Sequence, residues 1–312
     1  MATCARQSRR PGAVGAVWRS LAARAAPLRL AALAATVGML APTPALASTA
    51  HPSPADSVYE VYAVRYATVP GYRVRNLVVG ADSTRTTDLA MLVWVLRSAQ
   101  GRVVLVDTGF HRQKFLDSWK PSEYTLPSEA VARLGITPDQ VTDIVLTHIH
   151  WDHMDGLDLF PDAQVWIQKA EYDYYVGADG SALHRAIDPE DAKMIADMRA
   201  AGRVHLVDGD DQEIFPGIRV YTGGRHTYAS QYLGVRTGQG TVVVGSDNCY
   251  LYENLERHAA IAQTLDAASN LAALDRMRAL ASDPSLIVPG HDPKVFERFP
   301  KPGNGVAKIA GW

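Results

Sequence analysis

Three histidines and an aspartate stand within six positions of one another in residues 147–153, which read Thr-His-Ile-His-Trp-Asp-His. His148 and His150 are two residues apart, so on an extended backbone both side chains project to the same side. Asp152 and His153 follow where the chain turns towards a helix, and they can face a second point nearby. Zinc accepts imidazole nitrogen and carboxylate oxygen as ligands. The cluster therefore predicts a metal site, and its place directly after an apolar segment disfavours the alternative of a solvated histidine-rich loop.

Three more candidate ligands occur later in the chain, each beside glycine at the end of an apolar, strand-like segment. They are His226 after Gly223-Gly224-Arg225, Asp247 after Gly245-Ser246, and His291 after Pro289-Gly290. A single histidine in such a place is more often a structural hydrogen-bonding group than a metal ligand. Three such residues downstream of the histidine cluster favour one shared metal centre.

With these residues the chain resembles the metallo-β-lactamase superfamily, and within it most closely the N-acyl-homoserine lactonase family. The resemblance covers residues 58–299 and implies an α/β fold, an αβ/βα four-layer sandwich with two metals at one edge of the paired sheets. It extends to further stretches of sequence, namely 105–109 (Leu-Val-Asp-Thr-Gly), 165–168 (Val-Trp-Ile-Gln), 171–172 (Glu-Tyr), 213–217 (Glu-Ile-Phe-Pro-Gly) and 290–292 (Gly-His-Asp).

The resemblance also implies a complete ligand set for two Zn²⁺ ions per chain, with other divalent metals as alternatives. The family's ligands map onto one set of three (His148, His150 and His226), a second set of three (Asp152, His153 and His291), and Asp247 as a bridge between the two ions. A hydroxide held between two metals about 3.5–4 Å apart is a nucleophile at neutral pH. This chemistry would open a lactone ring.

Two catalytic roles follow from the same resemblance. Tyr250 matches a tyrosine that points at the substrate carbonyl and helps to hold the developing oxyanion, although taken alone it is equally well a core aromatic residue. Asp152 would also pass a proton from the nucleophile to the leaving alkoxide. Asp107 matches an acid that orients ligands without binding metal.

One segment departs from the family's pattern. Lactonases commonly read His-x-Pro-Gly-His around the third histidine ligand, whereas residues 226–230 here read His-Thr-Tyr-Ala-Ser. The ligand His226 is kept, but the proline, the glycine and the second histidine are lost. The shape of this loop and of part of the pocket wall is therefore left open.

The pattern of apolar segments predicts the elements that would position these residues. Strands are expected at 58–66, 89–97, 103–107, 143–147, 218–222, 241–245 and 285–289. Helices are expected at 128–134, from the cap at Asp188 to near Gly202, and at 261–281. Residues 300–312 are rich in proline and glycine and are expected to be a loosely docked C-terminal tail.

The first 47 residues are expected to be a cleaved secretory signal. They hold six arginines and no acid, followed by an apolar run at 28–41 and by Ala45-Leu46-Ala47. This is the composition of a signal peptide, and the run is too short for the alternative, a membrane anchor. Residues 48–57 are then a linker, and the mature protein is periplasmic or secreted.

Charge and cysteine content restrict the partners. The chain has 31 basic and 33 acidic side chains, and the loss of six arginines leaves 25 basic against 33 acidic. Such an acidic balance argues against nucleic acid or an anionic membrane as partner. Only Cys249 remains after cleavage, so no internal disulfide is expected. The expected partner is a small-molecule lactone.

Three functions remain in competition at this point. A lactonase fits best, and the alternatives are an exported β-lactamase or another ester or thioester hydrolase of the same superfamily. The common zinc β-lactamases have a cysteine where this chain has Asp247, which argues against that activity. A non-enzymatic metal-binding protein fits least, since such proteins usually lose ligands and here all seven positions are filled.

We predict that export removes residues 1–47, because these residues have the composition of a signal peptide. N-terminal sequencing of the secreted protein should then begin at or near Ser48. Material that begins well upstream, or protein that stays wholly in the cytoplasm, would contradict this prediction.

Overall fold

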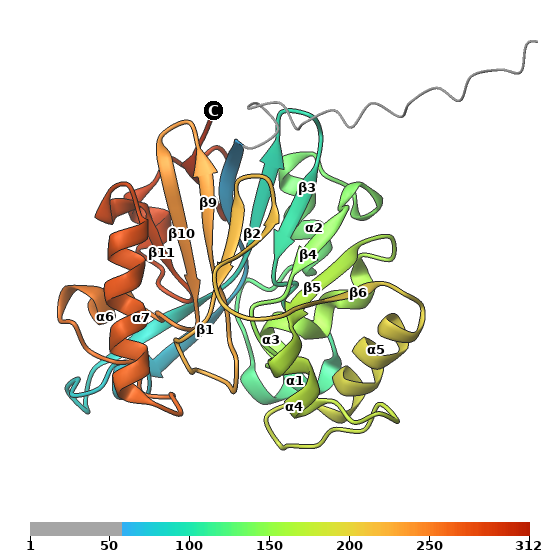
Figure 1. The fold of residues 1–312 in the computed structure, drawn as a ribbon. Helices are drawn as coiled ribbons and strands as arrows, with labels where there is room; N and C mark the ends of the chain where they lie inside the picture. The colour runs from blue at the N-terminus through green and yellow to red at the C-terminus, as the bar shows by residue number, and fades with distance from the viewer. Residues whose placement is uncertain (1–57) are drawn as a thin grey trace, which may run out of the picture. The chain divides into compact units, whose positions relative to one another are not determined.

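Residues 58–312 are described by the computed structural model, and they form two β-sheets with helices on the outer faces (Figure 1). The first sheet has seven strands, in spatial order β12 (Val306–Ala310), β1 (Tyr59–Arg73), β2 (Thr86–Ser98), β3 (Val103–Val106), β4 (Asp143–Val145), β5 (Gln164–Gln168) and β6 (Val204–Val207). The second has five, in the order β11 (Ile287–Pro289), β10 (Gly240–Ser246), β9 (Tyr232–Thr237), β8 (Ile218–Tyr221) and β7 (Gln212–Phe215).

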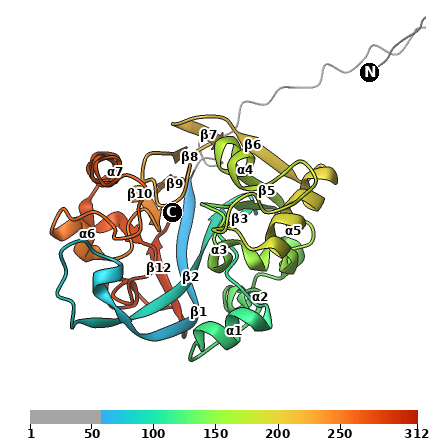
Figure 2. The same cartoon turned by 90° about the horizontal axis from the view of Figure 1, so that it is seen from below.

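The helices fall into two groups. Those against the first sheet are α1 (Gln113–Trp119), α2 (Pro127–Val131), α3 (Trp151–Met154), α4 (Lys169–Tyr175) and α5 (Pro189–Ala200). Those that follow β10 in the chain are α6 (Tyr252–Glu256), α7 (Ala267–Leu280) and α8 (Val295–Arg298). Short 3₁₀ turns occur at Val74–Asn76, Ala132–Leu134, Pro138–Gln140, Asp155–Leu159 and Pro284–Leu286. The two groups lie on opposite sides of the paired sheets (Figure 2).

Strand β2 shows why four layers form. Trp94 and Leu96 point into a core that also contains side chains of the second sheet, whereas Val93 and Val95 point into a core closed by helices α2, α4 and α5. Because successive side chains of a strand face opposite sides, a strand that is apolar at every position must be covered on both faces. The predicted four-layer α/β sandwich is therefore confirmed.

The expected strands are all present, although several bounds differ. The long helix expected at 261–281 begins only at Ala267, because Asp266 caps it by accepting hydrogen bonds from the amides of Ala268 and Ser269. Ile261 lies before the helix and pairs instead with Val78 in an isolated bridge. The strands β5, β6, β7, β9 and β12 were not predicted.

The expectation of a loosely docked tail at residues 300–312 is wrong. Residues Val306–Ala310 form β12, which pairs antiparallel with β1 at the edge of the seven-stranded sheet. Ala307, Ile309 and Ala310 are buried in the core between the sheets. The proline and glycine residues form the turn that reverses the chain before this strand, so the folded domain continues to the end of β12.

The expected signal peptide, the linker and the junction at Ser48 lie outside the described residues. Within residues 58–312, no helix is long and apolar enough to cross a bilayer.

We predict that β12 contributes to the stability of the whole domain. The substitution Ile309→Ala should lower the free energy of unfolding by about 2–4 kcal/mol, because a buried side chain leaves a cavity when it is truncated. Chemical denaturation measures this change, with the exposed Lys301→Ala as the control for the same segment. Equal effects of the two substitutions would contradict the docking of β12.

Candidate metal centre

The seven candidate ligands come from four loops that follow strands of both sheets. The histidine cluster follows β4 and ends in α3, His226 follows β8, Asp247 is the first residue after β10, and His291 follows β11. Gly290 permits the close approach of two of these loops, since a Cβ atom there would lie 2.9 Å from Asp247 Oδ1. The loops meet at one edge of the paired sheets (Figure 1).

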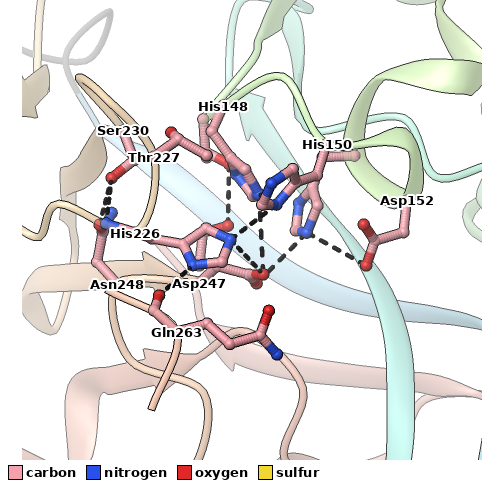
Figure 3. Close-up of polar contacts among 12 residues, drawn as sticks. His148, His150, Asp152, His226, Thr227, Ser230, Asp247, Asn248 and Gln263 are labelled. Atoms are coloured by element: carbon pink, nitrogen blue, oxygen red, sulfur yellow. Dashed lines mark hydrogen bonds and ion pairs between the residues drawn. The ribbon is translucent and has the colours of Figure 1, made fainter. Parts of the chain in front are cut away.

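One group contains His148, His150, His226 and Asp247, and its donor atoms converge (Figure 3). The Nδ1 atom of His150 lies 3.1 Å from His148 Nε2 and 2.8 Å from His226 Nε2. Asp247 Oδ2 lies 3.3 Å from His226 Nε2 and 3.8 Å from His148 Nε2. Donors about 2.0–2.1 Å from a tetrahedral metal have a similar mutual spacing.

The second group contains Asp152, His153 and His291. Asp152 Oδ2 lies 3.5 Å from His153 Nε2 and 3.7 Å from His291 Nε2. The other oxygen of Asp247, Oδ1, lies 3.3 Å from His153 Nε2 and 2.9 Å from His291 Nε2. The carboxylate of Asp247 therefore presents one oxygen to each group, which is the geometry that a bridging ligand requires.

The donor set fits two cations. His153 Nε2 and Asp247 Oδ1 are buried and have no hydrogen-bond partner among the described residues, although the two atoms are near one another. Buried polar atoms are rarely left unpartnered in folded proteins. Imidazole nitrogens and carboxylate oxygens directed at two points are the donors that zinc-class ions prefer.

Distal contacts fix which imidazole nitrogen faces the centre. The Nδ1 atoms of His226 and His291 lie 2.9 and 3.1 Å from the backbone carbonyl oxygens of Gln263 and Ala90, so each nitrogen carries the proton and donates it. His153 Nδ1 lies 2.8 Å from Asp107 Oδ2. In each of these rings Nε2 is thus the nitrogen that faces the centre.

The charge state of these groups also suits metal binding. Burial lowers the pKa of His148 well below its usual value and lowers the pKa of His150 and of His226 to about 4. These three rings are therefore neutral at pH 7 and keep their lone pairs. Burial opposes the charge of Asp247, but the neighbouring His291 and His153 hold the pKa of its carboxyl well below the usual range. Asp247 is therefore ionised.

A cavity of about 300 Å³ opens beside the centre. Both groups of candidate ligands contribute to its wall, through His150, His226, Asp247, Asp152 and His291. The rest of the wall is largely apolar or aromatic, formed by Tyr72, Leu77, Leu89, Met91, Trp119 and Trp151. A small molecule bound there would therefore lie against the converging donor atoms.

Tyr250 also lines this cavity, and its phenol oxygen lies 3.1 Å from His226 Nδ1. Burial, with the charges of Asp247 and Asp152, raises the pKa of Tyr250 well above its usual value. The phenol therefore stays protonated and can donate a hydrogen bond. Tyr250 is buried and belongs to the first hydrophobic core, and it also reaches the wall of the cavity, so its catalytic role stays a prediction.

Sequence reasoning missed the part played by Glu171, which it quoted only as a match to the family. This residue is fully buried and accepts hydrogen bonds from the hydroxyl of Thr227 at 2.5 Å, the amide of Ala229 at 2.6 Å and the amide of Ile149 at 3.3 Å. Burial raises the pKa of its carboxyl to about 7. Glu171 thus joins the loop of His148 and His150 to residues 226–230. These residues, which depart from the family's pattern, are called the altered loop below.

Three other histidines and the one described cysteine lie outside both groups of candidate ligands. His111 does not line the cavity, and its Nε2 atom lies 2.8 Å from an oxygen of Asp158. His205 stacks on Trp166, and His258 pairs with Asp275 at the surface. Cys249 is a buried thiol, and burial raises its pKa above the usual range, so it is packed and not a nucleophile.

Residues 86–291 match the family model of the metallo-β-lactamase superfamily, and the chain belongs to that superfamily. Among curated relatives, it is 29% identical over 163 residues to the N-acyl homoserine lactonase AiiA of Bacillus thuringiensis subsp. kurstaki, a stretch covering 51% of this chain and 59% of the relative. It is 26% identical over 247 residues to the N-acyl homoserine lactonase AiiB of Agrobacterium fabrum, covering 72% and 87%. The match to AiiA thus spans less than two thirds of that relative.

Solved structures show the same fold. A B. thuringiensis AiiA variant with N-decanoyl-L-homoserine at its active site superposes with a TM-score of 0.63 at 21% identity, covering 77% of this chain and 96% of the other. AidC, described as a dizinc quorum-quenching lactonase, superposes with a TM-score of 0.56 at 15% identity, covering 77% and 92%.

We predict that Asp107 controls metal affinity without contacting the metal. Its carboxylate accepts hydrogen bonds from the amide and the hydroxyl of Thr147, at 2.8 and 2.9 Å, and contacts His153 Nδ1. Asp107→Asn should weaken metal binding by about 10–100-fold, because the ring of His153 loses its acidic partner. Competition with a coloured chelator measures this, and unchanged affinity would contradict the assignment. Asp143→Asn is the control, since Asp143 is also buried and lies outside both ligand groups.

Proposed function

We propose that this protein is a metal-dependent hydrolase that opens lactone rings at a centre of two Zn²⁺ ions. The observation that carries the proposal is the carboxylate of Asp247, which directs one oxygen to each of two groups of buried donors beside a cavity. The similarity to N-acyl homoserine lactonases supports a lactone as substrate. His148, His150 and His226 would hold one ion, Asp152, His153 and His291 the other, and Asp247 both.

Two divalent cations held there would lower the pKa of a bound water molecule and polarise the carbonyl of the substrate. The protein's own task is to hold the ester group in the right place. The apolar wall that includes Leu89 and Met91 would exclude water from the acyl side group of the substrate. The lactone ring would then lie against the donor atoms of the centre.

Tyr250 would stabilise the negative charge that develops on the carbonyl oxygen. Its phenol is protonated, lines the cavity and lies beside His226 and therefore close to the first group of ligands. A positioned donor in a site shielded from water is most useful where charge appears during the reaction.

Asp152 would carry the proton. Its side chain is only partly buried and lines the cavity, with Oδ2 directed at His153 and His291. A carboxylate in this position can take a proton at its free oxygen from the attacking water and deliver it to the alkoxide that leaves the ring. The products would be the ring-opened hydroxy acid and no other fragment.

We also propose that the protein acts outside the cytoplasm. This rests on the composition of residues 1–47, with their six arginines and apolar run. N-acyl-homoserine lactones are small enough to reach such a compartment. A β-lactamase activity would also suit export, so turnover of a β-lactam is measured beside turnover of the lactone.

We predict that Asp247 and Tyr250 have separable effects on the reaction. Asp247→Ala should lose both metal and activity, because it removes a shared ligand and a negative charge. Tyr250→Phe should keep about two metals per chain but lose roughly a hundredfold in kcat, since one oxyanion donor typically contributes on the order of 3 kcal/mol. Elemental analysis and kinetics on an N-acyl-homoserine lactone measure the two effects.

The wild-type protein is the reference and should bind close to two zinc-class ions when purified without chelator. Full turnover by Tyr250→Phe would contradict the role of the phenol. One ion or none in the wild type would contradict the dinuclear centre, and efficient β-lactam cleavage without lactone turnover would replace the proposed substrate.

A further inference from the structure

The cavity beside the metal centre contains one cationic side chain, Arg185. Among the residues that line it, all others are apolar, aromatic, amide-bearing or part of the two ligand groups. Arg185 is exposed and makes no hydrogen bond or ion pair with any residue of the described part of the chain. The acids that follow it in sequence, Asp188 and Glu190, are instead paired with Lys114, at 2.7 and 3.0 Å.

The segment that carries Arg185 is held in place by a column of stacked rings. Tyr174 of α4 lies between Tyr228 and His184, with centroid distances of 4.0 Å on both sides and interplanar angles of 1°. Arg225 closes the column, because its guanidinium lies 5.2 Å from the Tyr228 ring and donates a hydrogen bond to the Tyr228 carbonyl at 2.7 Å. The residue before Arg185 is thus fixed to α4 and to the altered loop.

Backbone contacts restrain the same segment. Val176 pairs with Ala182, and the amide of Leu183 donates to the carbonyl of Tyr175 at 2.9 Å. On the other side, Ile187 is buried in the core beneath the helices. The segment of residues 177–186 is therefore anchored before and after Arg185, and the guanidinium is left free at the wall of the cavity.

We propose that Arg185 determines substrate specificity, and that the preferred substrate is a lactone whose side group carries a carboxylate. This rests on the proposed lactonase function and narrows its substrate class. A guanidinium binds a carboxylate through two parallel hydrogen bonds. No acidic side chain of the described residues competes for it, and the protein's acidic balance makes this local positive charge the feature that attracts an anion.

The column explains why the altered loop matters to this recognition. Tyr228 stands in the His-Thr-Tyr-Ala-Ser segment, and its ring is the contact between that segment and α4. Glu171 fixes the same loop from beneath through Thr227 and Ala229. The change of sequence after His226 thus keeps a candidate ligand and supplies a support for the wall that presents Arg185.

The test uses two N-acyl-homoserine lactones of equal chain length, one ending in a carboxylate and the other in a methyl group. Their lactam analogues, which resist hydrolysis, are bound to the full-length mature protein and measured by calorimetry. The wild type should bind the carboxylate lactam at least tenfold more tightly than the methyl lactam. Arg185→Ala should abolish this preference, Arg185→Glu should reverse it, and Arg185→Lys should retain part of it.

Control variants separate recognition of the carboxylate by Arg185 from the effect of the protein's net charge and from misfolding. Lys301→Glu changes the charge by the same amount as Arg185→Glu, at an exposed residue outside the cavity, and should keep the preference. Tyr228→Ala should weaken the preference because it shortens the column, whereas Tyr174→Phe keeps the stacked ring and should preserve it.

Two results would overturn the role of Arg185: wild-type protein that binds the two lactams equally, or Arg185→Ala that weakens both equally. The lactone pair tests the proposed function separately, by hydrolysis. Failure to open either lactone, with the lactam preference intact, would overturn the lactonase function and leave the recognition by Arg185 confirmed.

Discussion

The carboxylate of Asp247 sets the strictest physical requirement in this molecule. It is buried and ionised, and its two oxygens face separate groups of imidazole nitrogens. A carboxylate away from water is costly unless positive charge compensates it. His291 and His153 supply positive charge and hold the pKa of this carboxyl well below the usual range, and divalent cations bound at the two groups of donors would supply more. Both sheets contribute loops to this one point, and the rest of the fold serves to bring them there.

The loops are held by acidic groups that do not themselves face the cavity. Asp107 adopts a left-handed backbone conformation, with a φ of 62°, which is unfavourable for a residue other than glycine. The conformation is stabilised because its carboxylate accepts hydrogen bonds from Thr147 and contacts His153. Glu171 likewise accepts hydrogen bonds from the loop of His150 and from the loop of His226, and so holds these two loops together. Strain and buried charge are thus concentrated beside the centre, where they fix the direction of the ligands.

The segment proposed to recognise the substrate is separate from the loops that carry the candidate metal ligands. The candidate ligands follow strands, whereas Arg185 at the wall of the cavity is carried by residues 177–186, which contact α4 and, through the ring of Tyr174, the loop after His226. These segments are joined by stacked rings and a few backbone hydrogen bonds and not by a sheet. Substitutions in these segments need not move the candidate ligands, because the ligands are held by strands. A loop that departs from the family's pattern can therefore coexist with a complete set of candidate ligands.

The sequence by itself determined the strands that are apolar on both faces, such as β2, and hence the layered fold, because a strand of that kind must be covered twice. It also determined which histidines and aspartates are candidates, since their residue types and their places after strands are visible locally. Other features could not be read in this way. The short strand β12 has no strong pattern of its own and becomes a strand only by pairing with the edge of β1. Only the tertiary structure decided that Glu171 joins two loops and that Tyr174 stacks between Tyr228 and His184. Each of these relations joins residues distant in the chain, and no local pattern of residue types encodes the distance between them.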